Sequence, residues 1–365
     1  MALHKIGFIG LGLIGGSIAK KLHTLHPMLT IIATAGHIET IQQAYRQNLI
    51  ANQDFCDIND FSDCDYIFLC TPVKKNIEYL HQLKSIIGPD CIITDVGSVK
   101  TDIHQEVTAL HLEQNFIGGH PMAGSEKTGL SNADEYLLEN AYYIITPTGS
   151  VSSEKVSQFT DLVTSLGAIP MVLDYELHDY ATAAISHLPH IIAYSLVNLV
   201  KNSDDSNETM KTIAAGGFKD ITRIASSSPV MWENICLSNR EQILKLIDSY
   251  ISILQETKTD IAQSNREHLF DVFSAAKEYR DSITITQKGA LKPVYELYLD
   301  LRDEAGEIAS VATILADNNL SIKNIGIIHN REFEGGVLRL EMYDAKSLAL
   351  SLDLLRKRNC TIYER

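Results

Sequence analysis

Short apolar runs alternate with longer amphipathic stretches through the first 173 residues of this 365-residue chain. An apolar run of four or five residues predicts a buried strand, and apolar positions spaced three and four apart predict a helix. Strands are expected at residues 5–9, 30–34, 66–70, 91–95, 116–117, 142–146 and 169–173. Because strands and helices alternate, residues 1–173 are predicted to form a Rossmann-type α/β domain with a parallel, doubly wound sheet.

The strand-like runs stop after residue 173, and helical periodicity continues to about residue 281. The longest apolar stretch, residues 181–200, is interrupted by His187, Pro189 and His190, which a helix facing lipid would tolerate poorly. We therefore expect it to be a buried helix that lines a site. Further apolar residues recur at helical spacing and are expected in the core: Leu244, Ile247, Ile251 and Leu254. Residues 174–283 are predicted to form an all-helical domain.

A polar segment without periodicity, residues 284–293, predicts a linker to a third domain. Beyond it, strands are expected at 294–301, 322–329, 337–343 and 361–363, with helices at 308–316 and 348–358. This βαββαβ order predicts a ferredoxin-like fold. The hydrophobic pattern thus divides the chain into three domains, residues 1–173, 174–283 and 294–365.

Composition and charge narrow the class of protein. A hydrophobic content of 45% with 21% charged residues is typical of a soluble globular protein. The net charge of −15 argues against nucleic acid and anionic membranes as partners, because both favour a basic surface. No charged leader with an apolar core opens the chain, so a cytoplasmic protein is expected. The six cysteines include no CxxC pair, and neither a metal site nor a disulfide framework is expected.

The first predicted strand leads directly into a glycine-rich turn, and a predicted helix follows. The turn reads Gly10-Leu11-Gly12-Leu13-Ile14-Gly15. Its glycines allow a tight turn, close approach of the backbone to a pyrophosphate, and packing of helix on strand, while the helix N-terminus offers free N–H groups to the anion. This arrangement predicts a dinucleotide cofactor. Thr71 and Pro72 follow the third strand and are expected beside the cofactor.

The end of the second predicted strand lacks the residue that often identifies the cofactor. NAD-binding folds commonly place Asp or Glu there to accept bonds from the ribose hydroxyls, but this chain has Ala35, Gly36 and His37. It also lacks an Arg or Lys that would neutralise the 2′-phosphate of NADP. NAD is the expected cofactor, and NADP remains the alternative.

Polar residues follow the predicted strands at the edge where a doubly wound sheet binds its ligands. His120 stands between Gly119 and Pro121. Because proline keeps the preceding residue out of the helical region, we expect a loop that presents the imidazole, with a buried, satisfied histidine as the alternative. Ser98 follows the 91–95 strand. We expect it to line the ligand crevice at this edge, to be the N-cap of a helix that begins near residue 101, or to do both.

Two polar clusters interrupt the helical domain. Residues 186–190 place Ser186, His187 and His190 on an apolar helix, and residues 216–232 carry a second cluster around Arg223. The guanidinium of Arg223 is a rigid, charged fork suited to a carboxylate. A surface salt bridge is the alternative role for it.

Five separated motifs carry a family resemblance. They are the turn at residues 10–15, DVGSVK at 95–100, GGHPMAGSEK at 118–127, SHLPH at 186–190 and GFKDITR at 217–223. In this order, and over about residues 5–281, they resemble the prephenate/arogenate dehydrogenase family. The resemblance implies oxidative decarboxylation of prephenate to 4-hydroxyphenylpyruvate in tyrosine biosynthesis, with hydride transfer to NAD. It also implies that the helical domain, residues 174–283, binds substrate and forms a homodimer. Prephenate is favoured over arogenate because His190 would face the side chain, and arogenate stays open.

The same resemblance implies roles for individual residues. His120 would bond to the ring hydroxyl and act as the base, Ser98 would contact the same oxygen, and Arg223 would complete the catalytic set. The implied substrate-binding residues are Ser125, Glu126, Ser186, His190, Asp220 and Ser227.

The third domain resembles the ACT fold, a module that binds amino acids at paired edges. The ligand is expected near Asp303, Gly306, Asn324 and Ile325. Tyrosine, the end product of the pathway, is the expected inhibitor, and a purely dimerising appendage is the alternative.

Two other classes of protein share parts of this pattern. A different β-hydroxyacid dehydrogenase would keep the first two domains but carry a lysine-based site in place of the two histidine motifs. A non-catalytic nucleotide sensor would keep the glycine-rich turn and the amino-acid module.

Overall fold

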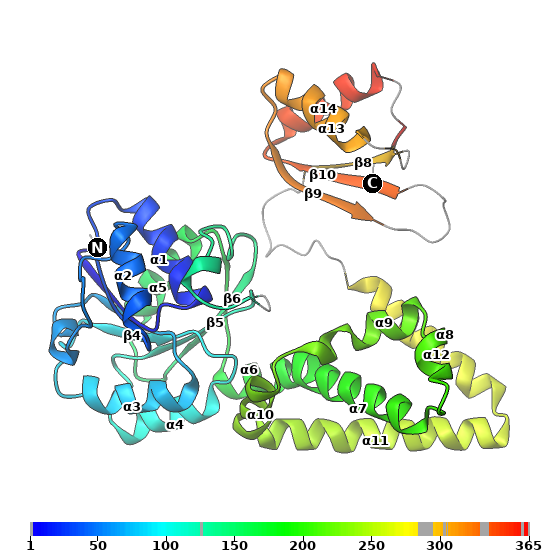
Figure 1. Cartoon of the computed structure of the whole chain (residues 1–365), viewed down its shortest axis with the longest axis horizontal. Helices are drawn as coiled ribbons and strands as arrows, with labels where there is room; N and C mark the ends of the chain where they lie inside the picture. Colours follow the sequence, from blue (N-terminus) through cyan, green and yellow to red (C-terminus); the bar gives the residue numbers. More distant parts are fainter. Residues whose placement is uncertain are drawn as a thin grey trace. The chain divides into compact units, whose positions relative to one another are not determined.

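The computed structural model describes residues 3–124, 127–283, 295–301, 304, 306–328, 336–358 and 361–363. The chain folds as two compact units, Met1–Ile285 and Thr286–Arg365, which are described separately (Figure 1). Three predicted site residues, Ser125, Glu126 and Asp303, lie outside the described residues.

A parallel sheet in the order β2-β1-β3-β4 organises the first unit. Its strands are β1 (Lys5–Ile9), β2 (Thr30–Thr34), β3 (Tyr66–Leu69) and β4 (Ile92–Asp95). The helical segments that follow or connect them are α1 (Leu13–Leu25), α2 (Ile38–Arg46), η1 (Ile58–Phe61), α3 (Val73–Leu83) and α4 (Thr101–Ala109). Strands β1 and β3 are covered on both faces, and the rings of Phe8 and Phe68 stack at 5.1 Å. The Rossmann-type parallel sheet predicted from the alternating pattern is therefore confirmed.

Beyond β4 the sheet becomes mixed, so an entirely parallel sheet is the wrong expectation. Strand β5 (Ile117–Pro121) lies beside β4 in parallel, but β6 (Tyr142–Pro147) runs antiparallel to β5, and β7 (Ile169–Val172) runs parallel to β6. The described residues between β5 and β6 contain only the short helix η2 (Leu130–Asn132), which cannot serve as a βαβ crossover. Helix α5 (Ser153–Ser165) supplies the crossover between β6 and β7.

His120 lies within β5 and pairs with β6, so the expected presentation loop is wrong. The glycines before it serve close packing instead of flexibility. A Cβ on Gly118 would lie 2.3 Å from Thr146 Oγ1, and a Cβ on Gly119 would lie 2.6 Å from Asp95 O. Only glycine allows β5 to approach its neighbours this closely, and His120 is consequently held on a fixed backbone.

The rest of the first unit is helical. It contains α6 (Tyr175–Thr182), η3 (Ala183–His187), α7 (Leu188–Ser203), α8 (Thr209–Ile213), α9 (Gly216–Thr222), η4 (Arg223–Ser226), α10 (Pro229–Ser238), α11 (Arg240–Gln263) and α12 (Arg266–Ser282). Segment η3 is a π-helical turn next to Pro189, which has no N–H to donate. Helix α11 packs against α7, α10 and α12, and its length is evident in Figure 1.

Much of the apolar surface of this helical region is uncovered in the single chain. Leu244, Ile251 and Leu254, expected in the core, are 49%, 45% and 49% exposed. Only Ala193 is buried in α7, so the expectation of a buried helix is also wrong for the isolated chain. The run Tyr175–Ser203 is long and apolar enough to cross a membrane by length and composition, and 17% of its most apolar window is buried.

The second unit has the βαββαβ order that its sequence predicts. It contains β8 (Tyr295–Leu301), α13 (Glu307–Asp317), β9 (Ile322–Ile328), β10 (Gly336–Met342), α14 (Ala345–Arg356) and β11 (Ile362–Tyr363). The antiparallel sheet has the order β11-β8-β10-β9, and both helices cover one of its faces (Figure 1). Apolar residues of sheet and helices form its core: Leu297, Leu299, Val311, Leu315, Leu338, Leu340, Met342 and Leu355.

Candidate active site

The glycine-rich turn has the geometry of a pyrophosphate cradle. Gly10 has φ of 100°, a left-handed conformation that favours glycine. A Cβ on Gly15 would lie 2.5 Å from Gly10 O, whereas Gly12 has no neighbouring atom within 4 Å of a built Cβ. Helix α1 begins without a side-chain cap and without an acidic residue in its first turn. Its N–H groups are therefore available to an anion.

Thr71 and Pro72 lie beside this turn, at the point where the strand order reverses between β1 and β3. A Cβ on Gly10 would lie 2.8 Å from Thr71 Cγ2. The Thr71 hydroxyl donates to Asn76 Oδ1 at 2.6 Å, and Pro72 is the N-cap of α3. Ligands of doubly wound sheets bind at such switch points, so both residues border the crevice predicted for the cofactor.

A buried ion pair joins the carboxyl ends of β4 and β5. Lys100 Nζ contacts Asp95 Oδ2 and donates to Gly119 O at 2.7 Å, and both charged side chains are fully buried. The Asp95 carboxylate also accepts from Gly97 N at 2.9 Å and Gly119 N at 3.2 Å. Burial lowers the pKa of Lys100, and the Asp95 charge opposes that shift. The pair fixes the backbone immediately before His120.

His120 is a buried histidine whose environment keeps it neutral. Burial, with the neighbouring His178, Lys100 and His187, lowers the pKa of His120 well below its model-compound value of about 6.5. Its Nδ1 lies 2.8 Å from His178 Nε2, and the two rings meet edge to face at 79°. Neutral imidazole at the carboxyl edge of a dinucleotide-type sheet is suited to accept a proton.

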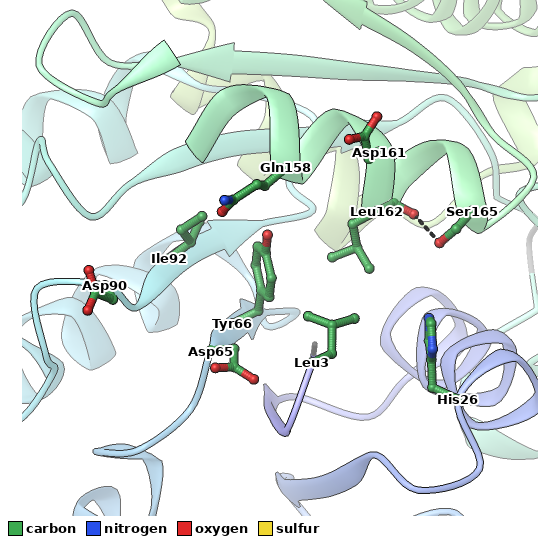
Figure 2. Close-up of a pocket in the computed structure, with 10 residues that line it drawn as sticks. All are labelled: Leu3, His26, Asp65, Tyr66, Asp90, Ile92, Gln158, Asp161, Leu162 and Ser165. Atoms are coloured by element: carbon green, nitrogen blue, oxygen red, sulfur yellow. Dashed lines mark hydrogen bonds between the residues drawn. The ribbon is translucent and has the colours of Figure 1, made fainter. Parts of the chain in front are cut away.

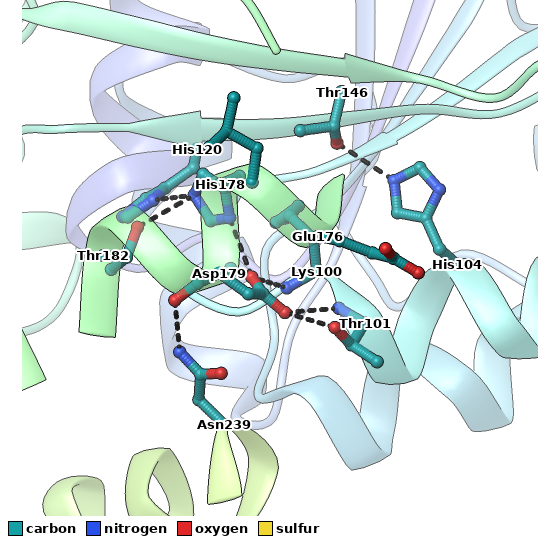
Figure 3. A network of polar contacts seen from close by, with 12 residues as sticks. Lys100, Thr101, His104, His120, Thr146, Glu176, His178, Asp179, Thr182 and Asn239 are labelled. Atoms are coloured by element: carbon teal, nitrogen blue, oxygen red, sulfur yellow. Dashed lines mark hydrogen bonds and ion pairs between the residues drawn. The ribbon is translucent and has the colours of Figure 1, made fainter. Parts of the chain in front are cut away.

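His178 and Asp179, which the sequence analysis did not single out, complete this part of the site (Figure 3). They belong to α6 and are 1% and 0% exposed. His178 Nδ1 lies 2.8 Å from Asp179 Oδ1. A sequence signal existed: with Thr182, they place three polar residues on the face of α6 that packs inward. Polar side chains on a buried helical face indicate partners or function.

Ser98 lies half-buried in the loop between Asp95 and Lys100, at the same edge of the sheet as His120. It isn't the N-cap of the following helix. Helix α4 has Lys100 as its N-cap residue, without a side-chain bond from that residue. The carboxylate of Asp179 accepts the Lys100 and Thr101 N–H groups at 2.8 Å each. The capping role proposed for Ser98 is therefore wrong, because a residue distant in sequence performs it.

The two histidines of the 186–190 motif contact one indole. His190 stacks on Trp232 with centroids 3.6 Å apart, and His187 meets it edge to face at 6.0 Å. His190 Nδ1 donates to Ser186 O at 2.9 Å. His190, Trp232 and Ser227 line a largely apolar cavity of about 240 Å³. Both imidazoles therefore lie on the same side of the helix, against Trp232.

Arg223 and Asp220 are exposed on the short segments α9 and η4. Burial lowers the pKa of His190, the bond to Ser186 O opposes the shift, and the nearby Arg223 charge lowers it further. The residues directly after Arg223, Ile224 and Ala225, line the His190 cavity, so Arg223 lies beside it. Among the described residues Arg223 forms no ion pair, so its guanidinium is available to an anionic ligand.

A second cavity, of about 230 Å³, lies at the opposite end of the sheet (Figure 2). It is bordered by the first residues of β3 and β4, Tyr66 and Ile92, and by α5 residues such as Asp161. Ligands of such sheets bind at the carboxyl ends of the strands, and this cavity lies at the amino ends. In the described part of the chain, no group of three or more His, Cys, Asp or Glu residues could hold a metal ion.

Comparison with known proteins identifies the family. Residues 18–172 match the nucleotide-binding domain of prephenate dehydrogenase, and residues 174–275 match its dimerization domain. The chain is 40% identical to prephenate dehydrogenase of Bacillus subtilis over 91% of its own length and 90% of that protein.

Solved structures agree with this assignment. Prephenate dehydrogenase from A. aeolicus, in complex with hydroxyphenyl propionate and NAD+, superposes with a TM-score of 0.72 at 31% identity, covering 78% of this chain and 99% of that one. Synechocystis arogenate dehydrogenase gives a TM-score of 0.70 at 30% identity, covering 77% and 100%. Together with the fold and the histidine-centred site, these matches show that the chain belongs to the prephenate dehydrogenase family.

Proposed function

We propose that the protein catalyses the NAD-dependent oxidative decarboxylation of prephenate to 4-hydroxyphenylpyruvate in tyrosine biosynthesis. The observation that carries the proposal is the state of His120. It is a buried, neutral imidazole with one nitrogen bonded to His178, and its other nitrogen is bonded to no residue in the described part of the chain. A base of this kind can take the proton of a hydroxyl whose carbon gives up a hydride.

The proposed reaction balances without a net proton. The turn at residues 10–15 would hold NAD, which would supply the acceptor for the hydride that leaves the ring carbon carrying the hydroxyl. His120 takes the hydroxyl proton, so a carbonyl develops at that carbon. Loss of carbon dioxide from the opposite ring carbon then makes the ring aromatic, and the electrons pass to the carbonyl oxygen. The proton returns from His120 to this oxygen, which regenerates the base in each turnover.

The cradle at Gly10–Gly15 fits a pyrophosphate, as its open helix N-terminus and close backbone packing show. The end of β2 carries neither Arg nor Lys at Ala35, Gly36 or His37 to hold a 2′-phosphate. The A. aeolicus relative was solved with NAD+. These observations support NAD as the cofactor that the turn would hold.

Prephenate carries two carboxylates, and a protein with a net charge of −15 needs a local cation to hold them. We assign this role to Arg223, with His190, Ser186 and Ser227 lining the pocket beside it. Ser98 would contact the same ring hydroxyl oxygen of the substrate as His120. By family resemblance we assign Asp220 and Glu126 as carboxylates that support or close the pocket, and Ser125 as a substrate-binding residue. Ser125 and Glu126 lie outside the described residues.

A homodimer would cover the exposed apolar face of the helical region. This assignment is supported by the match of residues 174–275 to the family's dimerization domain. Exposed apolar residues such as Leu199, Leu244 and Ile251 are costly in water unless a partner covers them. A second copy also accounts for the apolar run Tyr175–Ser203 without a membrane, and a cytoplasmic location is consistent with this role.

We further propose that the second unit is an ACT domain that binds tyrosine. Gly306 adopts φ of 102° at the start of α13, whose N-terminus has no side-chain cap. Asn324 and Ile325 are exposed on β9, an edge strand of the sheet. An uncapped helix N-terminus suits the carboxylate of an amino acid, and an open strand edge offers backbone acceptors to its amine. Asp303, assigned to the same site, lies outside the described residues.

The proposed activity is tested by following reduced-cofactor formation and carbon dioxide release with prephenate, arogenate and a 3-hydroxyacid as separate substrates. We expect activity with NAD and prephenate, and His120→Asn should lower turnover by about 10² to 10⁴. Faster turnover of arogenate would reassign the substrate to the second candidate, supported by the similarity to Synechocystis arogenate dehydrogenase. Activity with the 3-hydroxyacid alone, or with none of the three, would contradict the proposal.

The regulatory proposal is tested with a chain that ends near residue 285, at the boundary of the first unit. We expect this shortened enzyme to keep its activity and to lose inhibition by tyrosine. An Asn324→Ala change in the full chain should weaken the same inhibition without removing the domain. Tyrosine resembles the product, so undiminished inhibition of the shortened enzyme would place the tyrosine site in the His120 crevice instead.

A further inference from the structure

A line of buried polar contacts runs from the start of α4 to His120 (Figure 3). Asp179 Oδ2 accepts Thr101 N at 2.8 Å and Thr101 Oγ1 at 2.6 Å, and Asp179 Oδ1 accepts Lys100 N at 2.8 Å. Oδ1 also lies 2.8 Å from His178 Nδ1, and His178 Nε2 lies 2.8 Å from His120 Nδ1. Every member of this line is buried or half-buried.

The contacts determine where the protons are. Burial alone would raise the pKa of Asp179, but the bonds from His178, Thr101 and the Lys100 backbone lower it below its usual value. Asp179 is therefore an anion and can only accept. His178 must then carry its proton on Nδ1, which leaves Nε2 as an acceptor when the ring is neutral.

The consequence for His120 follows directly. Because His178 Nε2 accepts, His120 Nδ1 must carry the proton that is donated across the 2.8 Å contact. The other ring nitrogen of His120, Nε2, is left with its lone pair free. Thr182 Oγ1 lies 3.4 Å from His178 Nε2, a longer contact than the one to His120.

We propose that His178 and Asp179 are positioning residues that hold His120 in the tautomer with a basic Nε2. This inference rests on the proposed function, in which His120 takes the proton of the substrate hydroxyl. The hydroxyl proton moves to Nε2 and returns to the product oxygen, and no proton passes along the line to His178. Neither residue touches substrate or cofactor in this role.

His178 and Asp179 also stabilise the positive charge that forms on His120. After His120 takes the proton its ring is a cation, buried near the ammonium of Lys100, which disfavours it. The Nδ1–H bond to His178 becomes charge-assisted, and the Asp179 anion lies behind that ring. Where a carboxylate fixes the tautomer of a serine-protease histidine, its replacement by Asn costs roughly 10⁴ in turnover. Asp179 acts through one more ring, so we expect a smaller loss.

A purely structural role is the competing explanation, because Asp179 also caps α4 and its carbonyl accepts from Asn239 Nδ2 at 2.8 Å. Two substitutions of His178 separate the explanations. His178→Leu removes the acceptor for His120 Nδ1, whereas the amide oxygen of His178→Gln can occupy the position of Nε2 and accept the same proton. Both substitutions disturb packing, but only His178→Leu removes the acceptor that holds His120 in one tautomer.

We expect His178→Leu to lower kcat about 10- to 100-fold with the KM for prephenate within threefold of wild type, and His178→Gln to restore kcat to within about fivefold. Asp179→Asn should lower kcat by about 10² to 10³. His104→Gln is the matched control, since this buried histidine bonds to Thr146 and not to the line. Its kcat and pH profile should remain those of the wild type.

Long-range ¹H–¹⁵N NMR of histidine-labelled protein reads the tautomer independently of activity. His120 should show a protonated Nδ1 in the wild type and in His178→Gln, and a mixture or the opposite tautomer in His178→Leu. Equal kcat for the Leu and Gln variants, or a protonated Nε2 in the wild type, would overturn the inference. Wild-type activity in His120→Asn would instead overturn the proposed function, so the two failures are distinguishable.

Discussion

Replacing Lys100 with Met tests how the loop after β4 is held to strand β5. Methionine keeps much of the aliphatic length of lysine but removes the ammonium group. The Asp95 carboxylate would remain fully buried without its cation, and Gly119 O would lose its donor. Two N–H bonds, from Gly97 at 2.9 Å and Gly119 at 3.2 Å, would still reach the carboxylate.

The expected loss follows from these contacts. Removing one partner of a buried ion pair costs about 3–5 kcal/mol, because the other charge is left uncompensated. The two surviving N–H bonds favour the lower end, while the unpaired Gly119 carbonyl adds about 1 kcal/mol. We therefore expect Lys100→Met to lower the free energy of unfolding by about 3–5 kcal/mol. Asp95→Asn in the same chain should recover at least about 2 kcal/mol, since the buried charge is then gone.

Urea unfolding of the wild type, the two single variants and the double variant gives the complete cycle. Far-UV circular dichroism reports on the whole chain, and the fluorescence of Trp232, the only tryptophan, reports on the helical region. The midpoints should shift while the slope of the free energy with urea stays constant. A loss below about 1 kcal/mol for Lys100→Met, or losses that simply add in the double variant, would refute the argument.

Three further predictions concern the site and its pH dependence. Arg223→Ala should raise the KM for prephenate about 10- to 100-fold with kcat nearly unchanged, and an equal loss in both constants would contradict an anchoring role. Gly15→Ala should weaken NADH binding at least tenfold in a fluorescence titration, because its Cβ would lie 2.5 Å from a backbone oxygen, while Gly149→Ala, with open space around it, should not. Burial lowers the pKa of His104 and of His187 to about 4. In the unfolded chain the pKa of each histidine is near 6.5, so the unfolded chain binds protons first as the pH falls. Urea unfolding should therefore show the free energy of unfolding decreasing between about pH 6.5 and 4, by up to about 3 kcal/mol per histidine. A free energy of unfolding that does not change over this pH range would contradict the prediction.

The sequence predicts the first sheet and the second unit well, because their elements are specified by local pattern. Strands such as β1 and β3 are short apolar runs bounded by turns, and they occur where expected. The position of His120 could not be predicted in the same way. The glycines before it indicate flexibility when read locally, and their actual role depends on Thr146 and Asp95, which are distant in sequence or on another strand. A glycine chosen for close approach and one chosen for a turn look alike in the sequence.

The helical region shows a different limit. Residues such as Leu244 and Ile251 have the periodicity of a core helix, and they lie on the surface of the single chain. Apolar periodicity reports burial in the functional assembly, so it cannot distinguish a residue covered by its own chain from one covered by a second copy. The same physical cause gives the run Tyr175–Ser203 the composition of a membrane helix.

Helix α6 contacts the sheet through two adjacent side chains. Asp179 accepts the first free N–H groups of α4, and its neighbour His178 bonds to His120, so one short helix joins the sheet to the helical region. Any displacement of α6 from the sheet would break the cap and release the tautomer together. The exposed Arg223 lies outside this line of contacts, on η4, which packs on α7.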